Sequence, residues 1–174
     1  MKWRYYWDAI AMSTSASLVV GADGSTTKFG SSSGVSSAAD RSAFLKRRRS
    51  FDAILIGGNT ARTEPYSSSP VPLIVISRRM INPLPENPQV HLWNTTPAQA
   101  LGLARIEFGK RILVEAGVGM LKELLDDKLI DEFFLTVTRE QGGENYINWS
   151  KILKSFAHCE KSEMDGTLFF HAYN

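Results

Sequence analysis

Short apolar runs alternate with amphipathic segments along most of the chain. Continuous runs of this length are typical of strands that are buried on both faces of a sheet. The predicted strands are residues 18–20, 53–56, 73–76, 89–93, 111–115, 133–138 and 167–172. The predicted helices run from a cap at Ser36 or Ser37 to about residue 50, from 97 to 106 and from 120 to 128. This alternation predicts an α/β domain with a largely parallel sheet, helices on both faces and one antiparallel edge.

The composition fits one soluble domain over residues 1–174. A net charge of +2 and a hydrophobic fraction of 43% exclude a disordered chain. The single cysteine, Cys159, excludes a disulfide scaffold. No apolar run approaches the roughly 20 residues that span a bilayer, and no signal peptide is evident, so we expect a cytoplasmic protein that binds no membrane. A charge near zero gives no reason to expect a nucleic-acid partner.

The first residues have a pattern of their own. Trp3, Tyr5 and Trp7 alternate with charged or polar residues, which predicts a packed strand face or an interface rather than a cofactor platform. We therefore expect residues 1–15 to form an N-terminal extension or an edge strand.

Three predicted strand ends carry residues that suit a nucleotide. Ligands of open α/β sheets bind beyond the carboxyl ends of strands, where helices begin. Gly57 and Gly58 would let a ligand approach the backbone, although two glycines after a strand are more often a plain turn. Residues 115–121 combine a carboxylate with a glycine-rich helix start, which favours pyrophosphate binding slightly over simple packing. Ser77 and Arg78 would suit the 2′-phosphate of NADP, or form a solvated loop.

Other kinds of site are not indicated. The three histidines are scattered without metal-ligand spacing, so we expect no metal site. No GxSxG motif or Cys/His pair supports a covalent nucleophile. The basic run 46–49 is expected to end a helix and complement its dipole, while one of its arginines could still point into a site.

Together these segments resemble the C-terminal reductase domain of the bifunctional riboflavin-biosynthesis deaminase/reductase. The similarity covers about residues 10–145 and rests on the helix from Asp40-Arg41 through Arg48, on residues 51–60 and 112–117, and on 129–132. It implies a dihydrofolate-reductase-like fold and a homodimer. It also implies hydride transfer from NADPH to the ribose carbon of a 5-phosphoribosylaminopyrimidine, a small-molecule substrate.

The resemblance assigns site residues one by one. Glu64 and Glu115 are the catalytic candidates: Glu115 would hold the heterocycle, and Glu64 would fix the nicotinamide or relay a proton to the opening sugar ring. Ser32 and Arg48 would hold the substrate's phosphate, and Asp23 and Glu115 complete the substrate-binding set. The implied cofactor-binding residues are Val19, Thr60, Glu64, Ser77, Arg78, Gly117, Val118, Gly119, Met120 and Leu121.

The chain departs from the family pattern in its substrate half. The family has a Lys and then Ser-Leu-Asp-Gly, which aligns with either residues 11–13 or residues 21–24. We prefer the second register for its Asp-Gly turn, and it leaves Ser17 where the Lys would be. A family Leu-Thr-x-Arg motif is replaced by residues 67–69, which are all serine. Two phosphate donors are thereby lost, whereas the cofactor half is kept.

Three functions remain open. The first is the reduction step of the riboflavin pathway, without deamination, because the zinc-ligand set of the deaminase is missing. The second is a reductase of the same fold for another heterocycle, such as a pterin or folate-like compound, which the lost Lys and Arg favour. The third is a nucleotide-binding protein without catalysis, and the retained carboxylates Glu64 and Glu115 argue against it.

Overall fold

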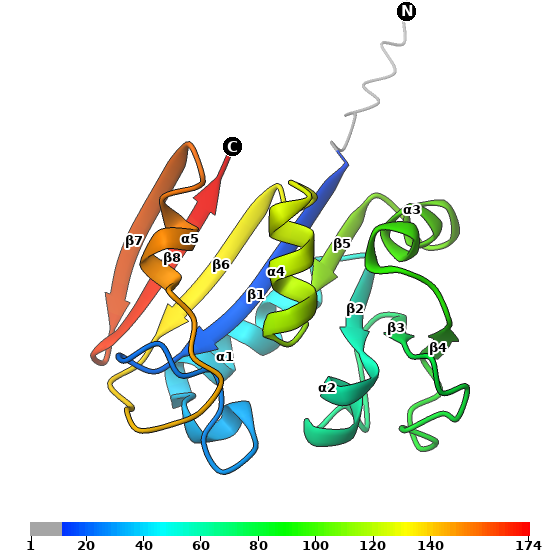
Figure 1. Ribbon diagram of the computed structural model, residues 1–174, viewed down its shortest axis with the longest axis horizontal. Coiled ribbons are helices and arrows are strands. Elements are labelled where there is room, and N and C mark those ends of the chain that lie inside the picture. Colours follow the sequence, from blue (N-terminus) through cyan, green and yellow to red (C-terminus); the bar gives the residue numbers. More distant parts are fainter. Residues whose placement is uncertain (1–11) are drawn as a thin grey trace, which may run out of the picture.

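The computed structural model describes residues 12–174 and is built on one sheet of eight strands (Figure 1). The strands are β1 (Ser13–Val20), β2 (Ala53–Gly57), β3 (Leu73–Ile76), β4 (Val90–Trp93), β5 (Arg111–Val114), β6 (Glu132–Val137), β7 (His158–Met164) and β8 (Thr167–Tyr173). The helices are η1 (Ser32–Gly34), α1 (Ala38–Arg48), α2 (Gly58–Thr63), α3 (Pro97–Glu107), α4 (Val118–Asp126) and α5 (Trp149–Leu153).

The sheet is parallel over most of its width and antiparallel at one edge. Its strand order is β4-β3-β2-β5-β1-β6-β8-β7. The strands from β4 to β6 pair in parallel, while β8 is antiparallel to both β6 and β7. The carboxyl ends of β1, β2 and β5 therefore meet at one edge of the molecule, where side chains from three separate segments can share a site.

Residues of the central strands alternate between two apolar cores. In β2, Leu55 packs with residues of α3 and α4, while Ile54 and Ile56 pack on the opposite face of the sheet. Helix α1 lies on that second face, away from α3 and α4 (Figure 1). The four residues from Ala53 to Ile56 have no solvent exposure, which explains why this strand shows no polar alternation. The predicted α/β fold with helices on both faces is confirmed.

Strand β1 is longer than its apolar residues indicate. It starts at Ser13 rather than at residue 18, and it is a central strand between β5 and β6. Thr14, Ser15 and Ala16 are fully buried although two of them carry hydroxyl groups. The assignment of residues 13–15 to an extension or edge strand is therefore wrong. The remaining part of that prediction, including Trp3, Tyr5 and Trp7, lies outside the described residues.

Strand β7 was missed because it has no buried face. It forms the outer edge of the sheet, and all seven of its residues are exposed. Its position comes from the hairpin with β8, in which Asp165 and Gly166 both have positive φ angles of 51° and 73°. An Asp-Gly pair in this conformation is the preferred two-residue hairpin turn. Within residues 12–174, no helix has both the length and the apolar composition needed to cross a bilayer.

Candidate functional site

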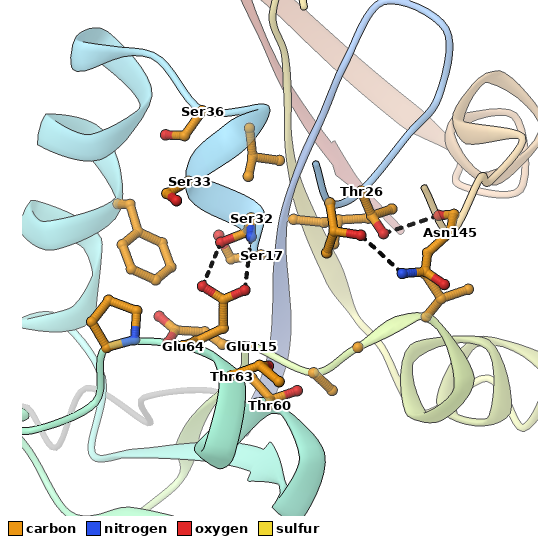
Figure 2. Close-up of a pocket in the computed structure, with 18 of the residues that line it drawn as sticks. Ser17, Thr26, Ser32, Ser33, Ser36, Thr60, Thr63, Glu64, Glu115 and Asn145 are labelled. Carbon is orange, nitrogen blue, oxygen red and sulfur yellow. Dashed lines mark hydrogen bonds between the residues drawn. The ribbon is translucent and has the colours of Figure 1, made fainter. Parts of the chain in front are cut away.

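A cleft of about 920 Å³ opens at the carboxyl ends of β1, β2 and β5. Its wall is rich in hydroxyl groups and includes both predicted catalytic carboxylates (Figure 2). The predicted site residues that line it are Val19, Ser32, Arg48, Thr60, Glu64, Glu115, Gly117, Val118, Gly119 and Met120. The topology of the sheet thus brings together residues that are far apart in the sequence.

Two predicted site residues have structural roles elsewhere. Asp23 does not line the cleft but holds the turn after β1, accepting hydrogen bonds from the hydroxyl and backbone N–H of Ser25 and from the N–H of Gly142. These bonds, that from the Ser25 hydroxyl first, lower the pKa of Asp23. Leu121 is 3% exposed in the apolar core, and its N–H donates to the Gly117 carbonyl. Neither residue lines the cleft, and the polar groups described here are already paired within the protein.

Ser77 and Arg78 lie beside the cleft rather than in its wall. A Cβ atom on Gly58 would lie 2.9 Å from Ser77 Oγ and 3.3 Å from Arg62 Nη1, so both groups approach the start of α2 closely. Only glycine permits this approach, because 2.9 Å is shorter than real Cβ contacts. Arg78 is exposed at the same end of β3.

The first turns of α2 and α4 face each other across the cleft floor. The Glu115 N–H donates to the Leu55 carbonyl, so the β2–β5 pairing extends to the residue before the turn. A Cβ on Gly117 would lie 3.6 Å from Thr60 Oγ1. Within residues 12–174, no side chain caps the N-terminus of α4. Its first free N–H groups and its dipole therefore favour an anion there.

A buried ion pair joins α1 to the end of β5. The Arg48 Nε lies 2.9 Å from Glu115 Oε1, and Arg48 Nη2 lies 2.7 Å from Glu115 Oε2. The Tyr66 hydroxyl donates to the same Oε2 at 2.8 Å. The two charged side chains are only 5% and 3% exposed. Arg48 and Glu115, which the resemblance assigned to different parts of a substrate, are thus bonded to each other.

This environment shifts two pKa values upward. Burial, and then the nearby Glu115 carboxylate, raise the pKa of the Tyr66 hydroxyl well above its usual value. Burial alone would lower the pKa of Arg48, but its bonds to Glu115 raise it overall. Arg48 therefore stays charged and Tyr66 stays a hydrogen-bond donor, which fixes the orientation of the Glu115 carboxylate.

The sequence of α1 explains how Arg48 reaches the cleft. The Ser37 hydroxyl accepts a hydrogen bond from the Asp40 N–H and begins the helix, while Lys46, Arg47 and Arg48 form its last turn. The Arg47 guanidinium lies over the Phe134 ring and donates to the Ser17 hydroxyl at 2.8 Å. Arg47 thereby anchors the helix to the sheet, and Arg48 is the arginine of the basic run that enters the site.

Glu64 connects α2 to η1 across the cleft. Its Oε1 accepts from the Ser32 N–H at 2.7 Å, and its Oε2 accepts from the Ser32 hydroxyl at 2.9 Å (Figure 2). The same Oε2 also accepts from the Ser31 hydroxyl at 3.2 Å. Glu64 is the C-cap residue of α2, and its own N–H donates to the Thr60 carbonyl. The backbone of Glu64 is therefore fixed by the end of α2, and its carboxylate is fixed by donors at the start of η1.

Sequence reasoning missed several cleft residues. Tyr66 lies in a serine-rich loop, and its only sequence signal is that it is an aromatic residue in polar surroundings. Thr26 donates to the Asn145 carbonyl at 2.9 Å, and Asn145 Nδ2 donates to Thr27 Oγ1 at the far end of the cleft (Figure 2). No local pattern indicates this contact, because it joins segments more than a hundred residues apart.

Most of the chain matches the sequence of one protein family. The RibD C-terminal domain family matches residues 13–138. The chain belongs to this family. No curated protein matches the chain.

Solved structures share the fold at low sequence identity. RibD from Acinetobacter baumannii matches with a TM-score of 0.68 and 14% identity, covering 94% of this chain and 58% of that one. A Thermotoga maritima diaminohydroxyphosphoribosylaminopyrimidine deaminase/5-amino-6-(5-phosphoribosylamino)uracil reductase matches at 0.68 and 15%, covering 94% and 56%. A pyrimidine reductase-like protein from Corynebacterium diphtheriae matches at 0.68 and 17%, covering 93% and 91%. The chain thus spans little more than half of the first two, and its fold is dihydrofolate-reductase-like.

Proposed function

We propose that this chain is an NADPH-dependent reductase of riboflavin biosynthesis. Its substrate would be 5-amino-6-(5-phosphoribosylamino)uracil or a derivative with the same pyrimidine and ribose, reduced at the ribose carbon. One observation carries the proposal: Glu115 and the uncapped glycine start of α4 follow each other at the end of β5 and line the same cleft. Family membership and the Thermotoga maritima protein's name support it.

The cleft has features that fit the anionic parts of NADPH. The free N–H groups at Val118, Gly119 and Met120 suit a pyrophosphate, and Gly117 has no side chain to obstruct it. Near the start of α2, Ser77 and Arg78 suit the 2′-phosphate. When bound, NADPH supplies the hydride.

The carboxylates have the roles of orienting the substrate and handling a proton. Glu115 Oε2 already accepts hydrogen bonds from Arg48 and Tyr66, whereas among residues 12–174 Oε1 accepts only from Arg48 Nε. A carboxylate oxygen has two acceptor sites, so Oε1 can accept an N–H of the heterocycle. Glu64 also lines the cleft, where it can contact the sugar and relay a proton to the opening ring.

Titration with NADPH and NADH tests the cofactor half of this proposal. Nicotinamide fluorescence should report micromolar NADPH binding, and Arg78→Ala should weaken it by about 10- to 100-fold, as expected for one charge-assisted hydrogen bond. Arg49→Ala, which removes an exposed arginine at the end of α1, is the matched control and should bind like the wild type. Failure to bind either nucleotide would refute the proposal.

The role of Glu115 is tested separately by Glu115→Gln. We expect NADPH binding to persist and turnover to fall, because the amide cannot replace the carboxylate opposite Arg48 and the heterocycle. Wild-type turnover in this variant would disprove the assigned role. A homodimer is part of the proposal, on the strength of the family resemblance, and sedimentation velocity of the full chain would test it.

A further inference from the structure

Carboxylates of the chain itself accept hydrogen bonds from four donor groups in the segment from Ser31 to Ser37. Glu64 accepts from the Ser31 hydroxyl and from both the hydroxyl and the N–H of Ser32. These three groups, which we call the Ser31–Ser32 donor site, are the kind of cluster that holds a phosphate. In this chain a fixed carboxylate fills it.

A second carboxylate removes another donor from the same wall. The Ser36 hydroxyl donates to Asp40 Oδ2 at 2.6 Å, and Asp40 is buried. The Ser37 hydroxyl is paired with the Thr167 hydroxyl and also accepts from the Asp40 N–H. A phosphate placed along this wall would thus meet two negative charges and few free donors.

The arginines near the cleft offer little compensation. Arg48 is neutralised by Glu115 in the buried ion pair. Arg47 is directed at Ser17 and the Phe134 ring. Arg41 lines the cleft as an exposed side chain whose guanidinium lies 5.7 Å from the centre of the Phe44 ring. Within residues 12–174 it makes no ion pair, so it is the one arginine of the lining available to a ligand.

Anion-binding groups lie instead at the start of α4 and beside the cleft. The uncapped start of α4, Arg62 and Arg78 lie around the ends of β5, β2 and β3. The walls of the cleft therefore differ in chemistry: one suits the phosphates of a nucleotide, and the wall formed by Glu64 and Asp40 suits hydrogen-bond donors.

We propose that the substrate meets Glu64 through the hydroxyl groups of an unphosphorylated sugar or polyol, and that the site discriminates against a phosphate ester at that position. This inference rests on the reductase function proposed above and, of the two substrate forms named there, favours the derivative without a phosphate over 5-amino-6-(5-phosphoribosylamino)uracil. Glu64 accepts three hydrogen bonds and has acceptor capacity left for a sugar hydroxyl. A phosphate, which carries nearly two negative charges at neutral pH, would be repelled by the same carboxylate.

Isothermal titration calorimetry of the full chain with a matched ligand pair tests this. The ligands are 5-amino-6-(ribosylamino)uracil and the same compound with a phosphate on the 5′-oxygen of its ribose. We expect the unphosphorylated compound to bind at least about tenfold more tightly, because the phosphate would make at least one repulsive contact with a like charge. Glu64→Gln should reduce this ratio by raising the affinity for the phosphate. Glu140→Gln, which alters an exposed carboxylate outside the cleft lining, should leave the ratio unchanged.

Other outcomes overturn the inference. Equal or tighter binding of the phosphorylated compound contradicts it, and loss of that preference in Arg41→Gln would identify the holder of the phosphate. Binding of neither compound also contradicts it. NADPH titration of the same samples separates the two proposals: a preference for the unphosphorylated ligand without nucleotide binding supports the ligand class and refutes the reductase.

Discussion

Removal of Arg48 should destabilise the protein strongly, because it would leave Glu115 charged and buried. The two side chains are 5% and 3% exposed and share three hydrogen bonds of 2.7 to 3.1 Å. In Arg48→Met, the Tyr66 hydroxyl would be the one hydrogen-bond donor to the Glu115 carboxylate that is left among residues 12–174. Breaking a buried pair from one side typically costs about 3–5 kcal/mol. The contacts of Arg48 with the Phe44 and Tyr66 rings add to this loss.

Urea unfolding at pH 7 measures this change. With a slope of about 2 kcal/mol per molar urea, the midpoint of Arg48→Met should fall by about 1.5–2.5 M. Arg49→Met, the adjacent exposed arginine, is the control and should stay within about 0.5 kcal/mol of the wild type.

A double variant separates the charge effect from packing. Arg48→Met with Glu115→Leu removes both charges and should be more stable than Arg48→Met alone, within about 2 kcal/mol of the wild type, because the unpaired Tyr66 hydroxyl is the main remaining cost. The reasoning is refuted if Arg48→Met costs less than about 1 kcal/mol, or if the double variant is less stable than the single one.

Three further predictions concern Tyr66 and two glycines. Because folding raises the pKa of Tyr66, its contribution to stability is complete below about pH 10, the unfolded value, and is lost as the pH rises toward the folded value; the stability difference between wild type and Tyr66→Phe should therefore shrink above about pH 10, and a constant difference would disprove this. Gly117→Ala should fold with a loss of at most about 1 kcal/mol, since its Cβ would meet Thr60 Oγ1 at an ordinary 3.6 Å, yet weaken NADPH binding by at least about tenfold, and unchanged fluorescence titrations would contradict that. A Cβ added at Gly102 in α3 would meet no atom within 4 Å, so Gly102→Ala should raise the free energy of unfolding by about 0.5–1 kcal/mol and leave NADPH binding unaltered. A destabilised variant would show that the space around position 102 is not open.

Sequence patterns predict those strands and helices whose buried positions are occupied by apolar residues. Strands β2, β3 and β5 are apolar on both faces, and α3 begins with a Thr96 capping box and a proline at its start. Strand β7 escaped prediction because pairing with β8, rather than burial, holds it in place. The start of β1 escaped because small hydroxyl residues fill its buried positions.

The candidate site divides in the same way. Local motifs located Glu115 and the glycine-rich start of α4, because both follow the end of a predicted strand, whereas Glu64 was assigned only through the family resemblance. The partners of those carboxylates depend on tertiary packing: Arg48 and Glu115 are 67 residues apart, and Ser32 and Glu64 are 32 apart. Asp23 was assigned to the substrate because its Asp-Gly turn matches the family motif, but the turn itself uses that carboxylate.

Isotope transfer tests the proposed reduction most directly. The protein would be incubated with each of the two aminopyrimidine ribosides and with NADPH carrying deuterium at either position of C4, and the product analysed by mass spectrometry. If the cleft performs the proposed hydride transfer, one of the two labelled forms adds a single deuterium to the ribose-derived carbon, and Glu115→Gln lowers the rate. Absence of label in the product with both labelled forms and both ribosides would contradict the proposed function.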